Sequence, residues 1–220
     1  MNKLHIDSIT KSFGPKKILR DIYMTCETGQ IVALLGGTGS GKSVLLKIIF
    51  GNIKGDTQFI KFNNEVLTKP SDRRNKIAYL PQQPMFPKNT RIKNLIPLFC
   101  NPENTHKLFN DALLQPFLNR TVRNLSGGER KLVEVLTVIH SEAEFILLDQ
   151  PYSGLSPILT EKVMKMIKEL SKDKGFIISN FMTEYALELS DEIYFLHDGI
   201  LKQIKDLNEL QQHYYLPKSI

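Results

Sequence analysis

The feature that most constrains the fold is the glycine-rich run GGTGSGKS at residues 36–43. It follows the apolar stretch IVALL and precedes the apolar run VLLKIIF. The run matches the pattern G-x-x-x-x-G-K-[S/T] between a strand and a helix, in which consecutive backbone N–H groups turn around a phosphate. The positive dipole end of the following helix adds to this cradle. A plain glycine-rich turn is the alternative, but average residue frequencies give such a match by chance in only roughly 1% of chains of this length.

Residues in and beyond this run are candidates for holding a nucleoside triphosphate with Mg²⁺. We expect Lys42 to reach the β- and γ-phosphates and the Ser43 hydroxyl to coordinate Mg²⁺. Asp149 ends the apolar stretch FILL and is expected to complete the metal shell. A lone aspartate at a strand end is usually a turn residue, but the cradle favours the functional interpretation. The remaining cradle positions are Gly36, Gly37, Thr38, Gly39, Ser40 and Gly41.

Strand-like and helical stretches alternate along the chain, which predicts an α/β fold with a mainly parallel core sheet. The first two strands flank the turn SFGPKK and should form an antiparallel hairpin. Strands are expected at residues 4–9, 18–25, 31–35, 57–62, 77–80, 145–148, 176–179, 192–197 and 201–204. After residue 157 the spacing of apolar residues predicts a helix. Its apolar positions are Leu159, Val163, Met166, Ile167 and Leu170.

Residues 84–124 differ from the rest of the chain. They hold five of the eleven prolines and short helical runs such as residues 103–114, with no clear strand. At 220 residues the chain suits a single domain. We therefore expect one domain, residues 1–220, with a nucleotide-binding core of residues 1–83 and 125–220 and a small helical subdomain of residues 84–124.

The net charge of +6 would suit nucleic acid or an anionic membrane surface, but the Lys and Arg residues are scattered. The nearest thing to a cluster is Arg73, Arg74 and Lys76, which is expected to be a solvated loop. The basic balance alone therefore decides nothing, and no nucleic-acid partner is expected for this chain. Cys26 and Cys100 stand far apart and outside any metal-ligand spacing, so buried thiols in a reducing cytosol are expected.

No apolar run approaches the roughly 18 residues that cross a bilayer, and the start MNKLHIDSIT lacks the apolar region of a secretory signal. If a membrane matters to this chain, we expect contact with it through a partner.

Residues 125–130 read LSGGER, ahead of the apolar helical run LVEVL. Together with the cradle, this motif resembles the ATP-binding cassette (ABC) family, whose signature is LSGGQ or LSGGE before a helix. From the residues alone, the S-x-x-E spacing is a helix capping box, and a capped helix N-terminus with two glycines is also a good anion site. In the family this end is offered to the γ-phosphate held by the other subunit of a head-to-tail dimer. The resemblance assigns that role to Leu125, Ser126, Gly127, Gly128 and Glu129.

Other motifs follow in the family's order and imply a P-loop NTPase fold that binds ATP and Mg²⁺. Phe13 in TKSFG stands where an aromatic ring stacks on adenine, although a core phenylalanine in a hairpin is the alternative. Gln82 in AYLPQQP stands where a glutamine contacts Mg²⁺ and senses the transporter; the alternative is a surface polar group. Near the end, LHDGIL resembles the family's closing hairpin.

Two departures from the family pattern lie in DQPYSGLSP, where the usual run is D-E-P-T-S-G-L-D-P. Gln150 replaces the glutamate that polarises the attacking water. An amide cannot accept that proton, and a positioned general base contributes about 10²–10⁴-fold. Ser156 replaces an aspartate that bridges the subunits, but Ser156 followed by Pro157 remains a sound helix N-cap pair.

The third departure lies in IISNFMTEYALELSDEIYFL. Alignment on AL and the strand EIYFL puts Phe181 at the position of the family's switch histidine, and a shift by one residue puts Asn180 there. Phe181 cannot donate a hydrogen bond to the γ-phosphate, and the loss of such a donor typically costs about 10²–10³-fold. The losses act on one transition state and are not multiplied. The binding elements are intact, so we expect ATP binding with weak hydrolysis at this chain's own site.

The resemblance implies the ATP-binding subunit of an ABC transporter, cytoplasmic and peripheral on the membrane. Its implied partners are a second ABC subunit, identical or different, and separate transmembrane permease subunits. In a heterodimer, LSGGER would complete a competent partner's site. A non-catalytic ATP-binding scaffold is the alternative. Soluble ABC proteins that act on nucleic acid or ribosomes usually have two cassettes or long insertions, and this sequence has neither.

Overall fold

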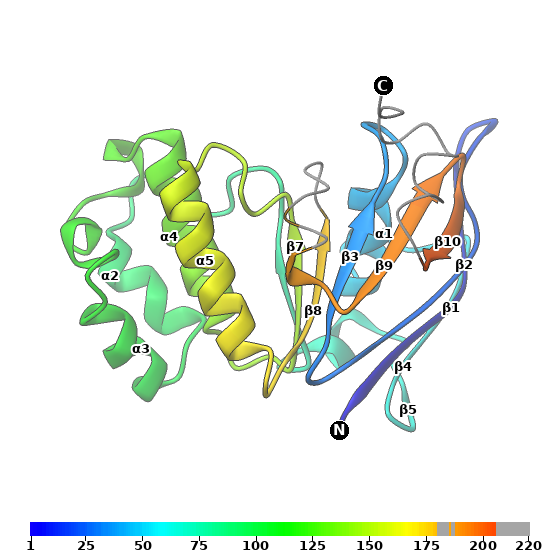
Figure 1. Ribbon diagram of the computed structural model, residues 1–220, viewed down its shortest axis with the longest axis horizontal. Coiled ribbons are helices and arrows are strands. Elements are labelled where there is room, and N and C mark those ends of the chain that lie inside the picture. The colour runs from blue at the N-terminus through cyan, green and yellow to red at the C-terminus, as the bar shows by residue number, and fades with distance from the viewer. Residues whose placement is uncertain (180–184, 186–187, 206–220) are drawn as a thin grey trace.

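The computed structural model describes residues 1–179, Tyr185 and residues 188–205 (Figure 1). Its larger sheet has six strands in the order β10-β9-β3-β8-β7-β6. All neighbouring strands pair in parallel except β9 and β10. The strands are β3 (Ile31–Leu35), β6 (Ile77–Leu80), β7 (Phe145–Asp149), β8 (Gly175–Ser179), β9 (Glu192–His197) and β10 (Ile200–Ile204). The predicted α/β fold with a mainly parallel core sheet is confirmed.

A second, antiparallel sheet has the order β2-β1-β4-β5. Its strands are β1 (Lys3–Phe13), β2 (Lys16–Glu27), β4 (Thr57–Phe62) and β5 (Glu65–Val66). The predicted N-terminal hairpin is confirmed, with Phe13 paired to Lys16 at its turn. The two-residue strand β5 was not predicted, because two residues show no periodicity.

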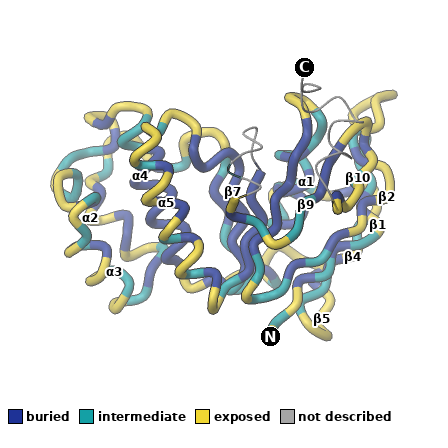
Figure 2. The backbone as a smooth tube through the Cα atoms, in the orientation of Figure 1, coloured by how far each residue is buried: buried dark blue, intermediate teal, exposed yellow. Residues whose placement is uncertain are grey.

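The six-stranded sheet is covered on both faces, as a parallel sheet requires. Along β7 the side chains alternate, so that Phe145 and Leu147 face one core while Ile146 and Leu148 face the other. The first core contains α1 (Lys42–Phe50) and the antiparallel sheet. The second contains α4 (Gly127–Ile139) and α5 (Pro157–Leu170). Figure 2 shows the strands between these layers as mostly buried.

The predicted helix after residue 157 is confirmed as α5. Val163 and Ile167 are fully buried, and Leu159, Met166 and Leu170 pack partly buried against the same core. The helix N-cap is Ser156, whose Oγ accepts a hydrogen bond of 3.4 Å from the Leu159 N–H, with Pro157 as the first helical residue. The capping role expected of this pair is therefore confirmed.

Residues 84–124 contain helices and turns and no strand. They hold α2 (Ile92–Leu95), α3 (Pro102–Phe109) and 3-10 turns at Ile96–Leu98, Gln115–Phe117 and Val122–Asn124. In Figure 1, α2 and α3 lie farthest from the antiparallel sheet, with α4 and α5 between them and the six-stranded sheet. The division of the chain into a core and a helical subdomain at these residues stays a prediction.

The helix predicted over residues 103–114 is wrong in its second half, because α3 ends at Phe109. The Asp111 carboxylate accepts the Leu113 N–H at 2.8 Å, and the Asp111 carbonyl accepts the Leu114 N–H at 3.0 Å. A side chain that binds a nearby backbone N–H offers the chain an alternative to the helix. Asp111 therefore turns the chain where the apolar spacing alone would have continued the helix.

The expectation of a solvated loop at Arg73, Arg74 and Lys76 is wrong for Arg73. This residue ends the 3-10 turn Pro70–Arg73 and is only 2% exposed. Its Nε donates to the Ile49 carbonyl and its Nη1 to the Lys69 carbonyl, both at 2.8 Å. Because Ile49 lies in the last turn of α1, the guanidinium satisfies a carbonyl at a helix C-terminus that has no partner within the helix.

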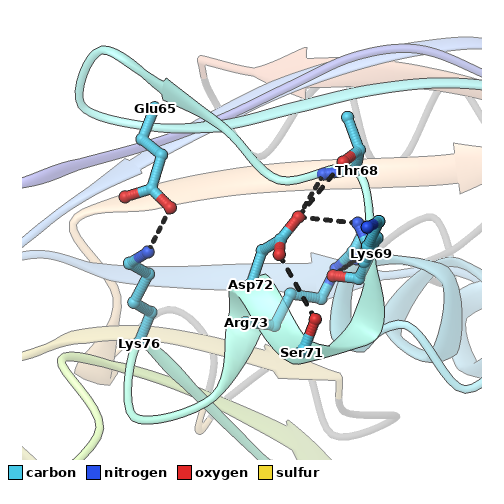
Figure 3. Close-up of polar contacts among 7 residues, drawn as sticks. All are labelled: Glu65, Thr68, Lys69, Ser71, Asp72, Arg73 and Lys76. Atoms are coloured by element: carbon cyan, nitrogen blue, oxygen red, sulfur yellow. Dashed lines mark hydrogen bonds and ion pairs between the residues drawn. The ribbon is translucent and has the colours of Figure 1, made fainter.

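Neighbouring polar contacts hold the backbone around Arg73 (Figure 3). Asp72 accepts the backbone N–H groups of Thr68 and Lys69 at 2.9 and 2.7 Å. Lys76 pairs with Glu65 at 2.6 Å, on the outside of the fold. The turn thus has a polar outer side and a buried cation on its inner side.

Both cysteines are buried free thiols, as expected. Burial raises the pKa of Cys26, and it raises the pKa of Cys100 to about 11. Within residues 1–179 and 188–205, no helix is long and apolar enough to cross a membrane.

Candidate nucleotide-binding site

The run GGTGSGKS forms the connection from β3 to α1. Three of its glycines have positive φ, namely Gly36 at 149°, Gly39 at 79° and Gly41 at 110°. A Cβ on Gly36 would collide with the Leu196 carbonyl oxygen, and a Cβ on Gly41 would stand 3.0 Å from a methyl group of Ile18. Glycine is therefore required at both ends of this loop by backbone conformation and by close neighbours.

The loop ends at the N-terminus of α1, where Gly41 is the N-cap residue and contributes no side chain. The first turn of the helix holds no acidic residue. Backbone N–H groups at a helix N-terminus lack partners within the helix, and the helix dipole favours negative charge beside them. This end of α1 fits a phosphate group.

Lys42 is the first residue of α1, directly after the loop, and is only 5% exposed. Its Nζ donates to the carbonyls of Gly36 at 2.5 Å and Gly37 at 2.9 Å. Burial lowers the pKa of the Lys42 ammonium to about 8, while the Asp149 carboxylate acts in the opposite direction. An anion beside this desolvated cation would stabilise its charged form.

Asp149 stands at the end of β7 and is fully buried. The Ser179 hydroxyl donates to its Oδ1 at 2.6 Å, and the Tyr79 hydroxyl to its Oδ2 at 3.3 Å. Burial, together with Asp149, raises the pKa of Tyr79, so the phenol remains a donor. The three residues end β7, β8 and β6 or lie within one residue of those ends, on the side of the sheet where β3 meets the phosphate loop.

Gln82 and Gln150 come together beside Asp149. Gln82 Nε2 donates to Gln150 Oε1 at 3.2 Å. Gln150 has φ of 53°, and its backbone N–H donates to the carbonyl and hydroxyl oxygens of Ser179 at 3.1 and 3.2 Å. A left-handed conformation is uncommon for a residue other than glycine and is held here by the two bonds to Ser179.

The proposed metal ligands Ser43, Gln82 and Asp149 include a single carboxylate. Among the described residues, no group of three or more His, Cys, Asp or Glu side chains is placed to hold a metal ion. Mg²⁺ keeps several waters and is usually bound by one or two carboxylates together with substrate phosphates. This small set of oxygen ligands therefore fits Mg²⁺ that arrives with a nucleotide.

A hollow of about 450 Å³ opens beside the phosphate loop. It lies between Gly39 and Ser40 on one side and the end of the N-terminal hairpin on the other, with Lys16, Lys17 and Arg20 in its wall. Phe13, at the end of β1, is 52% exposed, and Lys11 Nζ stands 5.4 Å from the centre of its ring. The alternative of a core phenylalanine at position 13 is therefore wrong.

The LSGGER segment starts helix α4 as a capping box. Ser126 Oγ accepts the Glu129 N–H at 3.2 Å, and Glu129 Oε2 accepts the Ser126 N–H at 2.7 Å. A Cβ on Gly128 would collide with the Gly154 carbonyl oxygen, whereas the space beside Gly127 is open. The predicted cap is confirmed, and its helix N-terminus lies against the turn that follows Gln150.

Two predictions at the third departure, Phe181 and its alternative Asn180, lie outside the described residues.

Sequence reasoning missed Tyr79 and Ser179, which hold Asp149, and two charged residues of α4, Lys131 and Glu134. Glu134 could have been noticed as a carboxylate within the otherwise apolar run LVEVL. Ser179 carries no comparable signal, because its role depends on which strand lies next to β7.

Three comparisons place the chain among known proteins. The family model described as "ABC transporter" matches residues 19–153. A probable ABC transporter ATP-binding protein of Azorhizobium caulinodans is 31% identical over 204 residues, covering 87% of this chain and 73% of that protein. The xylose/arabinose import ATP-binding protein XylG of Sulfolobus acidocaldarius is 32% identical over 213 residues, covering 89% and 85%. A solved nucleotide-free ATP-binding cassette from an ABC transporter has a TM-score of 0.81 and 26% identity, covering 99% and 96%.

Proposed function

Because the chain belongs to the ABC transporter family, we propose that it is a nucleotide-binding subunit that couples Mg-ATP binding to transport by separate membrane subunits. The observation that carries this proposal is the placement of two groups at one edge of the sheet. Lys42 begins α1 directly after the phosphate loop that follows β3, and the buried Asp149 ends β7, with only β8 between these strands. Burial lowers the pKa of Lys42 and the Asp149 carboxylate raises it, so the two charged groups interact.

Each part of the nucleotide has a counterpart in the chain. The loop N–H groups and Lys42 bind the phosphates, while Ser43, Gln82 and Asp149 provide oxygen ligands for Mg²⁺. The exposed ring of Phe13 stacks on the adenine. Bound Mg-ATP supplies the phosphoanhydride bond and the divalent charge.

Hydrolysis at this chain's own site is slow in this proposal. The Gln150 amide hydrogen-bonds water but cannot take its proton, and its oxygen already accepts the Gln82 N–H at 3.2 Å. Ser156 caps α5 and supplies no carboxylate at the subunit interface. Binding is retained while the group that would accept the proton is missing.

The chain works as a dimer in which residues 125–129 complete the partner's site. The start of α4 suits this role, because its capped N-terminus presents two glycine N–H groups to an anion. In a heterodimer this chain's weak site would stand beside a competent one.

Permease subunits dock in a groove of about 620 Å³ that runs between the core and the helical residues. Its wall includes Phe50, Tyr79, Met85, Leu98 and Phe99, and Leu98 is 74% exposed. Contiguous apolar surface is typical of a protein contact site, and the exposed Leu98 adjoins Met85 and Phe99 in this wall. Docking here would hold the chain at the inner face of the membrane.

A non-catalytic scaffold is the second candidate, favoured by the Gln82–Gln150 pair and by Ser156. In that case Mg-ATP holds a closed dimer without transport. A permease gene adjacent to the chain's gene, and co-purification of its product, would support the transporter subunit. Failure of an adjacent permease to bind the chain would favour the scaffold.

The proposal is tested by titrating the purified chain with a fluorescent ATP analogue and Mg²⁺. Lys42→Ala should weaken binding about 10–100-fold, because a charge-assisted hydrogen bond contributes about 1.5–3 kcal/mol. The matched control is Lys54→Ala, an exposed lysine outside the loop. Equal affinities of all three proteins would refute the binding site, and turnover of several per second by the wild type would refute slow hydrolysis.

A further inference from the structure

Two charged side chains of helix α4 form hydrogen bonds with the backbone of the loop that carries Gln82. Lys131 Nζ donates to the carbonyls of Pro81 and Gln82 at 3.3 and 3.2 Å. Glu134 Oε1 accepts the N–H groups of Met85 at 2.9 Å and Phe86 at 3.4 Å. A cation and an anion one helical turn apart therefore hold the two ends of residues 81–86, each through the backbone group of matching polarity.

Both charges are buried, since Lys131 is 8% exposed and Glu134 fully enclosed. They stand on α4 among the buried side chains of Leu132, Val133 and Val135. Burying a charge is unfavourable unless hydrogen bonds compensate, and apolar residues of similar size often stabilise such positions as well or better. The loop backbone compensates Lys131 Nζ and Glu134 Oε1, whereas Glu134 Oε2 is buried without a hydrogen-bond partner among the described residues. The carboxylate therefore costs stability at this position, and packing of the helix alone does not explain it.

The loop they hold leads directly to the candidate site. The Gln82 backbone carbonyl is bound by Lys131, and the Gln82 side chain is exposed and reaches Gln150 Oε1 at 3.2 Å. Because the Gln82 side chain is exposed, its position depends largely on that of its backbone. A displaced backbone would carry Gln82 away from Gln150 and Asp149.

We propose that Lys131 and Glu134 are positioning residues for Gln82: they fix the loop 81–86 so that the Gln82 amide stands at the metal site. This inference rests on the proposed function, because it assumes that Gln82 meets Mg²⁺ carried by ATP. Neither residue touches the nucleotide; both act through the loop backbone.

The test compares ATP-analogue affinity with and without Mg²⁺ for Glu134→Ala and Lys131→Met. Nucleotide affinity without metal should stay within about twofold of wild type, while the strengthening by Mg²⁺ should fall several-fold. Glu134→Gln should restore it, because an amide oxygen accepts the same N–H groups. Glu169→Ala and Lys165→Met, exposed positions on α5, are the matched controls. Folded Glu134→Ala protein with the Mg²⁺ dependence of wild type would overturn the inference.

If Glu134→Ala fails to fold, the decision rests on Lys131→Met combined with Gln82→Ala. Once Gln82 is removed, loosening its loop should have no further effect on the Mg²⁺ dependence. Additive effects of the two substitutions would contradict a shared pathway.

Hydrogen exchange separates this inference from the proposed function. The amides of Met85 and Phe86 should exchange at least about tenfold faster in Glu134→Ala than in Glu169→Ala, with or without nucleotide. Wild-type protein that binds no Mg-ATP would refute the proposed function. Unchanged exchange rates of these amides, in protein that does bind Mg-ATP, would refute only the proposal that Lys131 and Glu134 fix the loop 81–86.

Discussion

Asp149 and Ser179 face each other at the ends of two adjacent parallel strands, and the Ser179 hydroxyl donates a 2.6 Å hydrogen bond to the Asp149 carboxylate. The same hydroxyl accepts the backbone N–H of Gln150 at 3.2 Å. One buried side chain thus orients the carboxylate proposed to bind the metal and the residue at the predicted position of the catalytic base.

Replacing Ser179 by Ala should lower the free energy of unfolding by about 1–3 kcal/mol, because a buried carboxylate loses a donor. Urea unfolding measures this, with the exposed Ser153→Ala as control. The strengthening of ATP-analogue binding by Mg²⁺ should fall as well. Wild-type stability of Ser179→Ala would mean that the hydrogen bond contributes nothing to the fold.

Replacing Gln150 by Glu should raise ATP hydrolysis, since a carboxylate at this position can act as the base. Recovery should be partial if Phe181 occupies the predicted position of the switch histidine, because a phenylalanine side chain has no donor for the γ-phosphate. Phosphate release under saturating Mg-ATP is the measurement. Recovery to several turnovers per second would show that the role predicted for Phe181 is wrong.

Replacing Ser156 by Ala should cost about 1 kcal/mol of stability, because the Leu159 N–H loses its acceptor. Ser156→Asp should be close to wild type, since aspartate is an equally good N-cap and also introduces a carboxylate. Thermal unfolding distinguishes the two. If Ser156→Asp is as unstable as Ser156→Ala, the cap is not what position 156 contributes to the fold.

Replacing Arg73 by Ala should destabilise the protein by about 2–4 kcal/mol, because two backbone carbonyls lose donors and a buried side chain is removed. Arg74→Ala, its exposed neighbour, should stay within about 0.5 kcal/mol of wild type. Similar unfolding midpoints for the two variants would contradict the burial of Arg73.

Lys174 should make the free energy of unfolding depend on pH. Its Nζ donates to the carbonyls of Ile139 and Ser141 at the end of α4, and burial lowers its pKa from 10.5 to about 8. Between these values the unfolded chain binds a proton that the folded chain does not, so stability rises with pH. Relative to Lys174→Met, wild-type protein should gain on the order of 2 kcal/mol from pH 8 to 10.5.

Urea unfolding of both proteins across this range isolates the lysine from other titrating groups. A constant difference between wild type and variant would show that the Lys174 ammonium is not desolvated.

Most strands of the core sheet were predictable because they are apolar runs bounded by polar or glycine-containing turns, whereas β10, with the sequence ILKQI, is not such a run. The GGTGSGKS loop was predictable from its residue types, because the positive φ values at Gly36 and Gly41 are readily adopted only by glycine. The capping box at Ser126 and the N-cap at Ser156 are local as well, each decided within four residues.

Contacts between distant segments were not predictable in this way. Arg73 is buried only because the end of α1 lies over its turn, and nothing near Arg73 in the sequence indicates that neighbour. Gln82 and Gln150 meet because β6 and β7 are adjacent strands. The hydrogen bonds from Lys131 and Glu134 to the loop 81–86 likewise depend on where α4 packs.

Lys42 and Asp149 stand at the two ends of the chain segment that contains both the groove proposed to receive a permease and the loop of Gln82. A ligand that binds both residues closes that segment into a ring and limits the arrangements its backbone can adopt. Ligand binding and the internal arrangement of the segment are then thermodynamically linked. A partner that prefers one arrangement of the groove changes the affinity for nucleotide, and nucleotide changes the affinity for that partner by the same factor.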